Sequence, residues 1–365
     1  MHNVGILTFY DTTNYGALFQ MYALEKKVKH LSADSRVSII QYDCQEVDRR
    51  EKISILQSRS IKEFVKNCIL YVPNRIKHDA FERFAMENIQ FSKIKYNKCN
   101  LSKLNEEYDA IIVGSDQVWN STLTGNDLGF YLPGCNGIKK YSYAASFGKK
   151  SMPEPARDII SHCLNDFRKV SVREKDGEKI VRDLGISCET VLDPTFLLSK
   201  EEWMQLADKE RKPSNYILMY LVQDRKNTFE YAKRLAKEKG YLIKYINISP
   251  RYEYGVENIR TASPTEFMNL LANAELIITG SYHGVALSIN LEKNFICELN
   301  HGAVQFNSRI QNLLSELDLD DRIIDHDAKN VSDIDYEKVN IKLDACRKRS
   351  LIYLQSVIED IYEHD

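Results

Sequence analysis

The sequence lacks the features that mark several common classes of protein. Its eight cysteines form no close pair, which argues against a disulfide framework or a zinc cluster and is typical of a reducing compartment. With 50 Lys and Arg against 52 Asp and Glu, a formal net charge of -2 gives no general attraction to nucleic acid. No apolar run reaches about 18 residues, and no basic leader precedes an apolar segment at the N-terminus. We therefore expect a cytoplasmic protein that binds anions only locally.

The sequence also lacks an internal repeat and a low-complexity tract, and its 365 residues exceed the size of one typical core. Strand-like and helix-like segments alternate along it, which predicts mostly parallel sheets with helices on both faces. A polar segment at residues 199–213 predicts a domain boundary. We expect two doubly wound, Rossmann-like domains at residues 1–198 and 199–335, facing a cleft. A long amphipathic helix in residues 336–365 is expected to pack back toward the first domain.

Residues 49–100 break the alternation and predict a helical insertion in the first domain. Ile61, Phe64, Val65, Cys68 and Ile69 fall on one helical face, and the segment carries 12 Lys or Arg against 5 Asp or Glu. Such a charge bias usually marks a solvated helical face. A basic amphipathic segment can also contact anionic lipid or an anionic acceptor, so peripheral contact with the inner face of a membrane stays open as an alternative.

The segment LIITGSYHGVALSI at residues 276–289 combines a buried strand, a tight turn and the start of a helix. In an α/β sheet such a turn lies at the carboxyl end of the strand, where ligands bind, and the N–H groups of the following helix attract anions. His283 is therefore the strongest candidate for chemistry in the sequence. The alternative is a histidine held by backbone groups in a surface turn.

Two earlier segments have the same strand-to-helix plan. Residues 4–9 predict a strand, and the turn Asn14-Tyr15-Gly16 leads into a helix at residues 17–31, where the turn geometry alone could explain these residues. Residues 108–113 predict a buried strand that ends at Gly114, Ser115 and Asp116. The alternative role for Asp116 is to cap the next helix.

Two arginines lie at the ends of predicted elements, one at the end of a strand and one at the start of a helix. Arg173 is the last residue of a predicted strand at residues 169–173, where it can meet an anion at the sheet edge. A surface ion pair with Glu174 or Asp176 is its alternative. Arg309 opens a predicted helix that runs to residue 317.

Seven motifs in this order resemble those of the polysaccharide pyruvyl transferases: NYGA (14–17), VGSDQVWN (113–120), YAASFG (143–148), VSVRE (170–174), VLDPTFLL (191–198), ITGSYHG (278–284) and FNSRI (306–310). The resemblance extends over about residues 4–325. It implies a GT-B-like fold and transfer of pyruvate from phosphoenolpyruvate onto sugar hydroxyls as a ketal. It also implies a role in surface or extracellular polysaccharide synthesis, with a sugar or lipid-linked acceptor.

Phosphoenolpyruvate carries a carboxylate and a phosphate, so this chemistry needs cations, a proton donor and a base. We assign the cations to Arg173 and Arg309, which can contact an anion through two N–H groups. His283 is the expected proton donor or phosphate ligand, and Asp116 the expected acceptor of the hydroxyl proton. The family pattern has an arginine where this chain has Ser281, and Arg309 is expected to replace it. Further expected substrate-binding residues are Asn14, Tyr15, Gly16, Ser115, Trp119, Ser281, Tyr282 and Gly284.

No metal or cofactor is predicted, and two other functions stay open. The same two-domain plan serves glycosyltransferases that use nucleotide sugars, and Glu298 is the candidate ribose ligand for that function. The third candidate is a non-catalytic sugar-binding protein, although titratable groups at several strand ends are more than binding alone requires.

Overall fold

The computed structural model describes residues 1–51, 60–152, 154–207, 215–221, 226–299, 307–324 and 332–363. The chain divides into two compact units. The first contains Met1–Glu51, Ala85–Leu197 and Asp344–Asp365, and the second contains Lys52–Phe84 and Leu198–Leu343. The predicted polar boundary at residues 199–213 and the motif at residues 306–310 lie partly outside the described residues.

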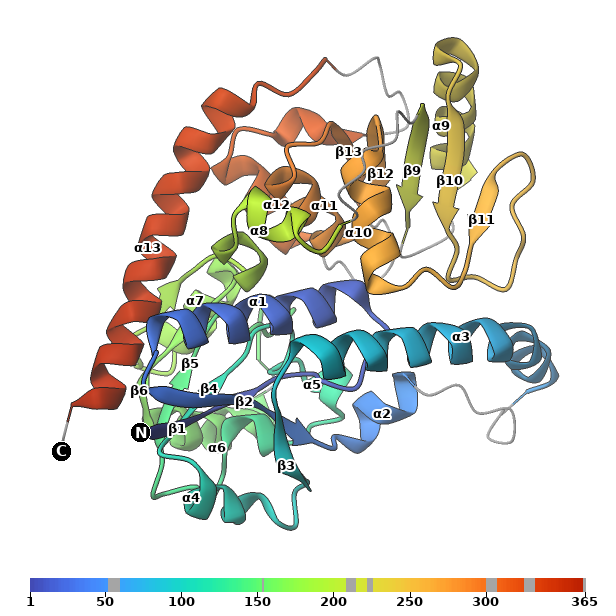
Figure 1. Cartoon of the computed structure of the whole chain (residues 1–365). Coiled ribbons are helices and arrows are strands. Elements are labelled where there is room, and N and C mark those ends of the chain that lie inside the picture. Colours follow the sequence, from blue (N-terminus) through green and yellow to red (C-terminus); the bar gives the residue numbers. More distant parts are fainter. Residues whose placement is uncertain are drawn as a thin grey trace. The chain divides into compact units, whose positions relative to one another are not determined.

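The first unit is built on a six-stranded parallel sheet with the order β3-β2-β1-β4-β5-β6 (Figure 1). In the centre of the sheet, Ile6 pairs with Ile39 on one side and with Ile112 on the other. A parallel pair of short strands, β7 and β8, follows later in the chain. The strands are β1 (His2–Leu7), β2 (Ser35–Tyr42), β3 (Phe91–Tyr96), β4 (Ala110–Val113), β5 (Lys139–Ser142), β6 (Phe167–Lys169), β7 (Ser171–Val172) and β8 (Glu189–Thr190).

The second unit repeats this topology with the order β11-β10-β9-β12-β13-β14, and all its strand pairs are parallel (Figure 1). Its first strand, β9, therefore lies between β10 and β12, as β1 lies between β2 and β4. The strands are β9 (Tyr216–Tyr220), β10 (Leu242–Ile246), β11 (Glu257–Ile259), β12 (Leu276–Thr279), β13 (Phe295–Glu298) and β14 (Ile323–Ile324). Two doubly wound α/β sheets confirm the predicted fold class.

The central strands explain why the sequence signals parallel sheets. Every residue of β4 and of β9 is buried, and both strands are nearly continuous apolar runs. The central strands of a parallel sheet are covered by helices on both faces, so they need no alternating polar positions.

Several helices begin at residues whose side chains satisfy their first N–H groups. Ser263 and Glu266 form a capping box at the start of α10, with Pro264 in its first turn. The α-helices are α1 (Tyr15–Leu31), α2 (Gln45–Glu51), α3 (Ile61–Asn88), α4 (Leu104–Glu107), α5 (Ser121–Thr124), α6 (Glu154–Asn165), α7 (Lys175–Arg182), α8 (Lys200–Met204), α9 (Lys226–Lys239), α10 (Pro264–Asn273), α11 (Tyr282–Asn290), α12 (Ser308–Glu316) and α13 (Tyr336–Tyr362). The 3-10 helices are η1 (Leu101–Lys103), η2 (Gly129–Tyr131), η3 (Pro194–Leu197) and η4 (Asp320–Arg322).

The prediction that residues 49–100 are helical is wrong at the C-terminal end of this segment. Helices α2 and α3 occupy much of the segment, but Phe91–Tyr96 forms the edge strand β3. Only the second and last residues of this strand are buried, so it has little of the apolar alternation that identifies a strand. Residues 52–59 of the segment lie outside the described residues.

The long C-terminal helix α13 belongs to the first unit from Asp344 onward. Within that unit, the Tyr353 hydroxyl donates to the carbonyl of Ser142, 2.9 Å away. The amide of Leu192 donates to the Ser350 hydroxyl, also over 2.9 Å. These bonds join the helix to the sheet and to the chain just before η3. Among the described helices, none is both long and apolar enough to cross a bilayer.

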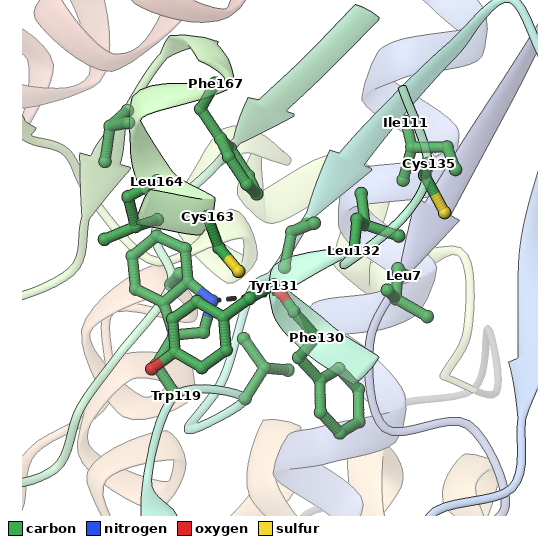
Figure 2. Close-up of a cluster of buried hydrophobic side chains, with 14 of the residues drawn as sticks. Leu7, Ile111, Trp119, Phe130, Tyr131, Leu132, Cys135, Cys163, Leu164 and Phe167 are labelled. Atoms are coloured by element: carbon green, nitrogen blue, oxygen red, sulfur yellow. Dashed lines mark hydrogen bonds between the residues drawn. The ribbon is translucent and has the colours of Figure 1, made fainter. Parts of the chain in front are cut away.

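Trp119 lies in the main hydrophobic core of the first unit (Figure 2). Its indole stacks on Tyr131, with ring centroids 5.5 Å apart, and its N–H donates to the carbonyl of Phe130 over 3.1 Å. Phe147 and Phe167 pack around the same indole. The side chain is 3% exposed, so its position gives it a packing role. Substrate binding by Trp119 stays a prediction that this burial does not favour.

Candidate active site

Each six-stranded sheet has one point where the strand order reverses, and several of the predicted site residues follow the strands at these two points. In the first unit the reversal lies between β1 and β4, and in the second between β9 and β12. Ligands of open α/β sheets bind outside the carboxyl ends of the strands at such a switch point. Asp116 follows β4 and His283 follows β12, so both are in the expected position.

In the first unit, glycine allows the chain to turn sharply after β4. Gly114 has a φ of +116°, and a Cβ atom there would lie 2.3 Å from the carbonyl oxygen of Tyr143. Asp116 has a φ of +68°, a left-handed conformation that aspartate tolerates better than most residues. The Thr8 hydroxyl donates to the carbonyl of Ser115 over 3.0 Å and joins this turn to the end of β1.

The turn after β4 continues the sheet edge toward Arg173. Isolated parallel bridges pair Asp116 with Ala145 and Ala145 with Val172. These three positions therefore lie in one row across the carboxyl ends of neighbouring strands. Arg173 follows Val172 directly, which places its side chain beside the Asp116 turn.

Three carboxylates surround the Arg173 guanidinium. Its nitrogens lie 2.7 Å from an oxygen of Asp193, 3.4 Å from one of Asp116 and 4.0 Å from one of Glu174. The Arg173 side chain is 1% exposed, so the alternative of a surface ion pair is wrong. With all groups ionised, one positive and three negative charges leave this buried cluster, Asp116–Arg173–Glu174–Asp193, formally negative.

Asp193 belongs to this cluster, although it is not among the site residues predicted from the sequence. Its second carboxylate oxygen accepts from the Thr195 hydroxyl at 2.8 Å and the Thr195 amide at 3.0 Å. Ser115, which is fully buried, donates to Asp193 over 3.4 Å. The sequence signal was the position of Asp193 before Pro194 in the VLDPTFLL motif. Burial of an aspartate in this way requires partners, and Arg173 is the charged one.

Two other polar residues of the first unit have local structural roles. Asn14 caps α1, because its side-chain oxygen accepts from the amides of Gly16 at 2.9 Å and Ala17 at 3.4 Å. Tyr15 is 1% exposed, whereas Asn14 is exposed. Helix α5 is capped by Asn120, so the alternative of Asp116 as its cap is wrong. Substrate binding by Asn14, Tyr15 and Gly16 stays a prediction.

In the second unit, a network of hydroxyls fixes the start of α11. The Thr279 hydroxyl donates to the carbonyl of Tyr220 over 2.7 Å and accepts from the amide of Ser281 at 3.1 Å. Ser281 is the N-cap, and its hydroxyl accepts from the amide of Gly284 at 3.3 Å. A Cβ atom on Gly284 would lie 2.3 Å from the Thr279 hydroxyl oxygen, which explains the glycine at this position.

His283 is the second residue of α11, one residue after the helix begins. It is 8% exposed, so it does not lie in the surface turn that was its alternative, and its ring meets Tyr282 edge to face at 5.2 Å. The guanidinium of Arg309, which is half-buried, lies 5.7 Å from the ring centroid of Tyr282. The structure therefore brings Ser281, Tyr282, His283 and Arg309 together around one helix N-terminus, where the helix dipole favours negative charge.

Glu298, the candidate ribose ligand, ends the strand next to the His283 turn. Strand β13 pairs with β12, with Cys297 opposite Thr279. Glu298 is 9% exposed, and its backbone carbonyl would lie 3.2 Å from a Cβ atom on Gly280. It is therefore close to the turn through its backbone.

One group of possible metal ligands occurs among the described residues. His78, Asp79 and Glu82, all on α3, bring their ligand atoms within 4.8 Å of one another. Asp79 and Glu82 are exposed, and exposed acidic groups commonly occur without a metal. The group lies outside both switch points, and we assign it no role.

Two sheets with the same strand order, each with a polar turn at its switch point, define a two-domain α/β protein of the GT-B class. Residues 14–302 match the family described as polysaccharide pyruvyl transferase. The chain belongs to this family, which is a family of transferases. No curated protein matches the chain.

Solved structures agree on the fold. UDP-GlcNAc 2-epimerase from Neisseria meningitidis bound to UDP-GlcNAc is 12% identical, with a TM-score of 0.51 over 99% of this chain and 99% of that one. S. aureus MnaA with UDP is 14% identical, with a TM-score of 0.51 over 98% of this chain and 91% of that one. At this identity the likeness concerns the fold alone.

Proposed function

We propose that the protein transfers a pyruvyl group from phosphoenolpyruvate to two hydroxyls of a sugar, forming a ketal and releasing phosphate. The acceptor would belong to a surface or extracellular polysaccharide or to its lipid-linked precursor, and the reaction would take place in the cytoplasm. Family membership supports the class of reaction. The observation that carries the proposal is the position of His283 in the first turn of α11, at the switch point of the second sheet.

The proposed donor site is the N-terminus of α11. Phosphoenolpyruvate is strongly anionic, and the N–H groups of a helix start together with an arginine favour such a ligand. Arg309 lies over Tyr282 in this region, and Ser281 takes the position where the family pattern has an arginine. Arg309 is therefore the residue that we assign to the donor's phosphate or carboxylate.

The proposed acceptor site is the buried cluster Asp116–Arg173–Glu174–Asp193. Its excess of carboxylates disfavours an anionic donor but suits a neutral sugar, whose hydroxyls donate hydrogen bonds to carboxylates. Two aspartates pair with Arg173, and Asp116 is the more exposed of them. Its side chain is 10% exposed, whereas that of Asp193 is fully buried. We assign to Asp116 the removal of the proton from the attacking hydroxyl.

Arg173 has a different role in this arrangement from the one expected from the sequence. A guanidinium already 2.7 Å from one carboxylate and 3.4 Å from another would have to give up a buried ion pair to bind a donor anion. We propose that Arg173 holds the Asp116 carboxylate in position through their ion pair, and that direct donor binding by Arg173 is the alternative to be tested.

The reaction then needs only groups on this chain and its two substrates. His283 donates a proton to the methylene carbon of phosphoenolpyruvate, which leaves a positive centre at its second carbon. A sugar hydroxyl attacks this centre while Asp116 takes its proton. The bond to phosphate breaks, the second hydroxyl closes the ketal, and its proton leaves with phosphate. No cofactor is required, because the donor carries its own leaving group.

A nucleotide-sugar donor is the second candidate function. It is favoured by the shared fold of structures determined with UDP-GlcNAc and UDP. Glu298 beside the His283 turn would be the ribose ligand in that case. Such a donor would also place its phosphates at the N-terminus of α11.

Donor-dependent thermal stability separates these two functions. A ligand that binds only the folded state, at a hundredfold excess over its dissociation constant, adds roughly 2.7 kcal/mol of stability. We expect phosphoenolpyruvate to raise the melting temperature and UDP-sugars not to do so. The saturated analogue phospholactate should also stabilise the protein but release no phosphate with an acceptor present. Stabilisation by UDP-sugars alone would refute the proposed donor.

A further inference from the structure

The N-terminal half of α3 carries a stripe of exposed apolar side chains. We define the stripe as Ile61, Phe64, Val65, Ile69 and Val72. Successive spacings of 3, 1, 4 and 3 residues place all five on one side of an α-helix. Their exposed fractions are 85, 47, 50, 46 and 61%. Four of these residues, Ile61, Phe64, Val65 and Ile69, belong to the face predicted from the sequence, and in the described chain all five stripe residues are exposed.

Such a stripe is unusual for the surface of this protein. Contiguous large apolar residues on a surface commonly mark a contact with a partner or a membrane. Tyr71, which is 45% exposed, and Ile76, which is 50% exposed beyond Pro73, extend the same apolar surface along α3. The helix therefore presents aliphatic and aromatic side chains to whatever binds there.

The charges beside the stripe indicate which partner fits. Residues 61–77 contain four Lys or Arg and one acidic residue, Glu63. Lys62, Lys66 and Arg75 are exposed, whereas Lys77 is buried and lies over the ring of Phe81. A helix with an apolar face and lysines on its polar side lies in the interface of an anionic bilayer, with its apolar residues among the lipid chains.

We propose that the N-terminal half of α3 is a docking surface for an anionic phospholipid bilayer. The stripe inserts its apolar side chains, and Lys62 and Lys66 face the lipid phosphates. Contact with lipid needs neither a donor nor an acceptor, so this interaction is independent of the reaction proposed above. For an enzyme with a lipid-linked acceptor, it would hold the protein at the surface where that acceptor is found.

Vesicle binding by the full-length protein tests this proposal. Vesicles of phosphatidylcholine with about one-third phosphatidylglycerol should bind the protein, and pure phosphatidylcholine vesicles should bind it at least about tenfold more weakly. The double variant Val65→Glu/Ile69→Glu should lose roughly tenfold or more in affinity, because it places charge in the apolar stripe. Lys62→Glu/Lys66→Glu should reduce binding to the anionic vesicles by a similar factor and flatten the salt response.

The matched control is Ile341→Glu/Ile352→Glu on α13, where the two side chains are 73 and 58% exposed. It introduces the same charges at exposed isoleucines outside the stripe and should bind vesicles as the wild type does. The proposal is overturned if the wild type does not bind anionic vesicles, or if the stripe variant binds as well as the control. It is also overturned if the wild type is a dimer without affinity for lipid and only the stripe variant is monomeric, because the stripe would then join two copies of the chain. Circular dichroism on each variant shows that α3 has not unfolded.

Discussion

The two switch points share one topology but differ in charge. In the first unit, three carboxylates and one arginine are buried after β4, β7 and β8. In the second, a histidine lies in the first turn of a helix, with an arginine over the neighbouring tyrosine. Strand order alone cannot make this difference, because the orders correspond strand for strand. The side chains placed at the strand ends determine what each sheet can bind.

This difference separates two tasks that one reaction requires. A buried site with excess negative charge accepts hydrogen bonds from hydroxyls and repels phosphate. A helix N-terminus with a cationic neighbour favours phosphate. The proposed transfer needs both environments, since its donor is anionic and its acceptor neutral. The predictions that follow test this division by changing one switch point at a time.

The largest effect is expected at the second switch point. His283→Gln keeps a side chain of similar size that can donate a hydrogen bond but cannot transfer a proton. General acid catalysis typically contributes about 100- to 10,000-fold, so ketal formation and phosphate release should fall by that range. The melting temperature should change little, because glutamine can occupy the helix start.

The matched control is His162→Gln at the exposed C-terminal end of α6. It makes the same chemical change on another helix and should leave turnover near that of the wild type. Near-normal turnover of a folded His283→Gln variant would show that the histidine is structural, and the proposed mechanism would have to be abandoned.

A smaller but more specific effect is expected from Arg173→Lys and Arg309→Lys. Lysine keeps the charge but loses the planar, two-pronged contact. If Arg173 positions Asp116, Arg173→Lys should lower kcat roughly tenfold and leave the dissociation constant of phosphoenolpyruvate unchanged. Arg309→Lys should weaken donor binding by roughly the same factor.

Isothermal titration of the donor and steady-state kinetics of both variants distinguish the two roles. Weaker donor binding by Arg173→Lys would show that Arg173 contacts the donor, as expected from the sequence. The anionic donor would then bind in the first unit. Unchanged donor binding by Arg309→Lys would remove the second unit's arginine from the donor site.

Local sequence patterns predicted the positions of the site residues but not their partners. A buried apolar run followed by a glycine and polar residues was enough to place Asp116 and His283 at strand ends, and the structure confirms both positions. The partners of Arg173 could not be predicted in this way. Asp193 lies 20 residues from Arg173 and Asp116 lies 57. The bridges through Ala145 bring Asp116 close to Arg173, and the pairing of β7 with β8 brings Asp193 close to it.

Trp119 and β3 are two further features whose tertiary contacts the sequence pattern did not reveal. The sequence places Trp119 beside polar motif residues, but its neighbours in space include Phe147 and Phe167, which belong to later segments. Strand β3 is an edge strand with few buried residues, so its sequence lacks the pattern that identified the central strands. Tertiary contacts determine both the burial of Trp119 and the formation of β3. A single sequence contains no direct signal for such contacts.

The last prediction concerns the stability of the two turns and the glycines that shape them. Gly114→Ala combines a φ of +116° with a Cβ atom 2.3 Å from the Tyr143 carbonyl, so the backbone itself must move. Gly284→Ala meets the Thr279 hydroxyl at the same distance, but its φ carries no such strain, and a side chain can shift more easily than the backbone. Gly185→Ala is the control, because its φ is +80° and no atom lies within 4 Å of the added Cβ.

We expect Gly114→Ala to cost about 3 kcal/mol of unfolding free energy, Gly284→Ala about 2 and Gly185→Ala about 1. Urea unfolding of the three variants gives these values directly. Gly284→Ala should also reduce turnover more than its loss of stability explains, because the displaced Thr279 hydroxyl holds the amide of Ser281 just before His283. Equal costs at Gly114 and Gly185 would show that the turn after β4 can relax around a side chain. The close approach of Gly114 to Tyr143 would then not be what keeps Asp116 at the sheet edge.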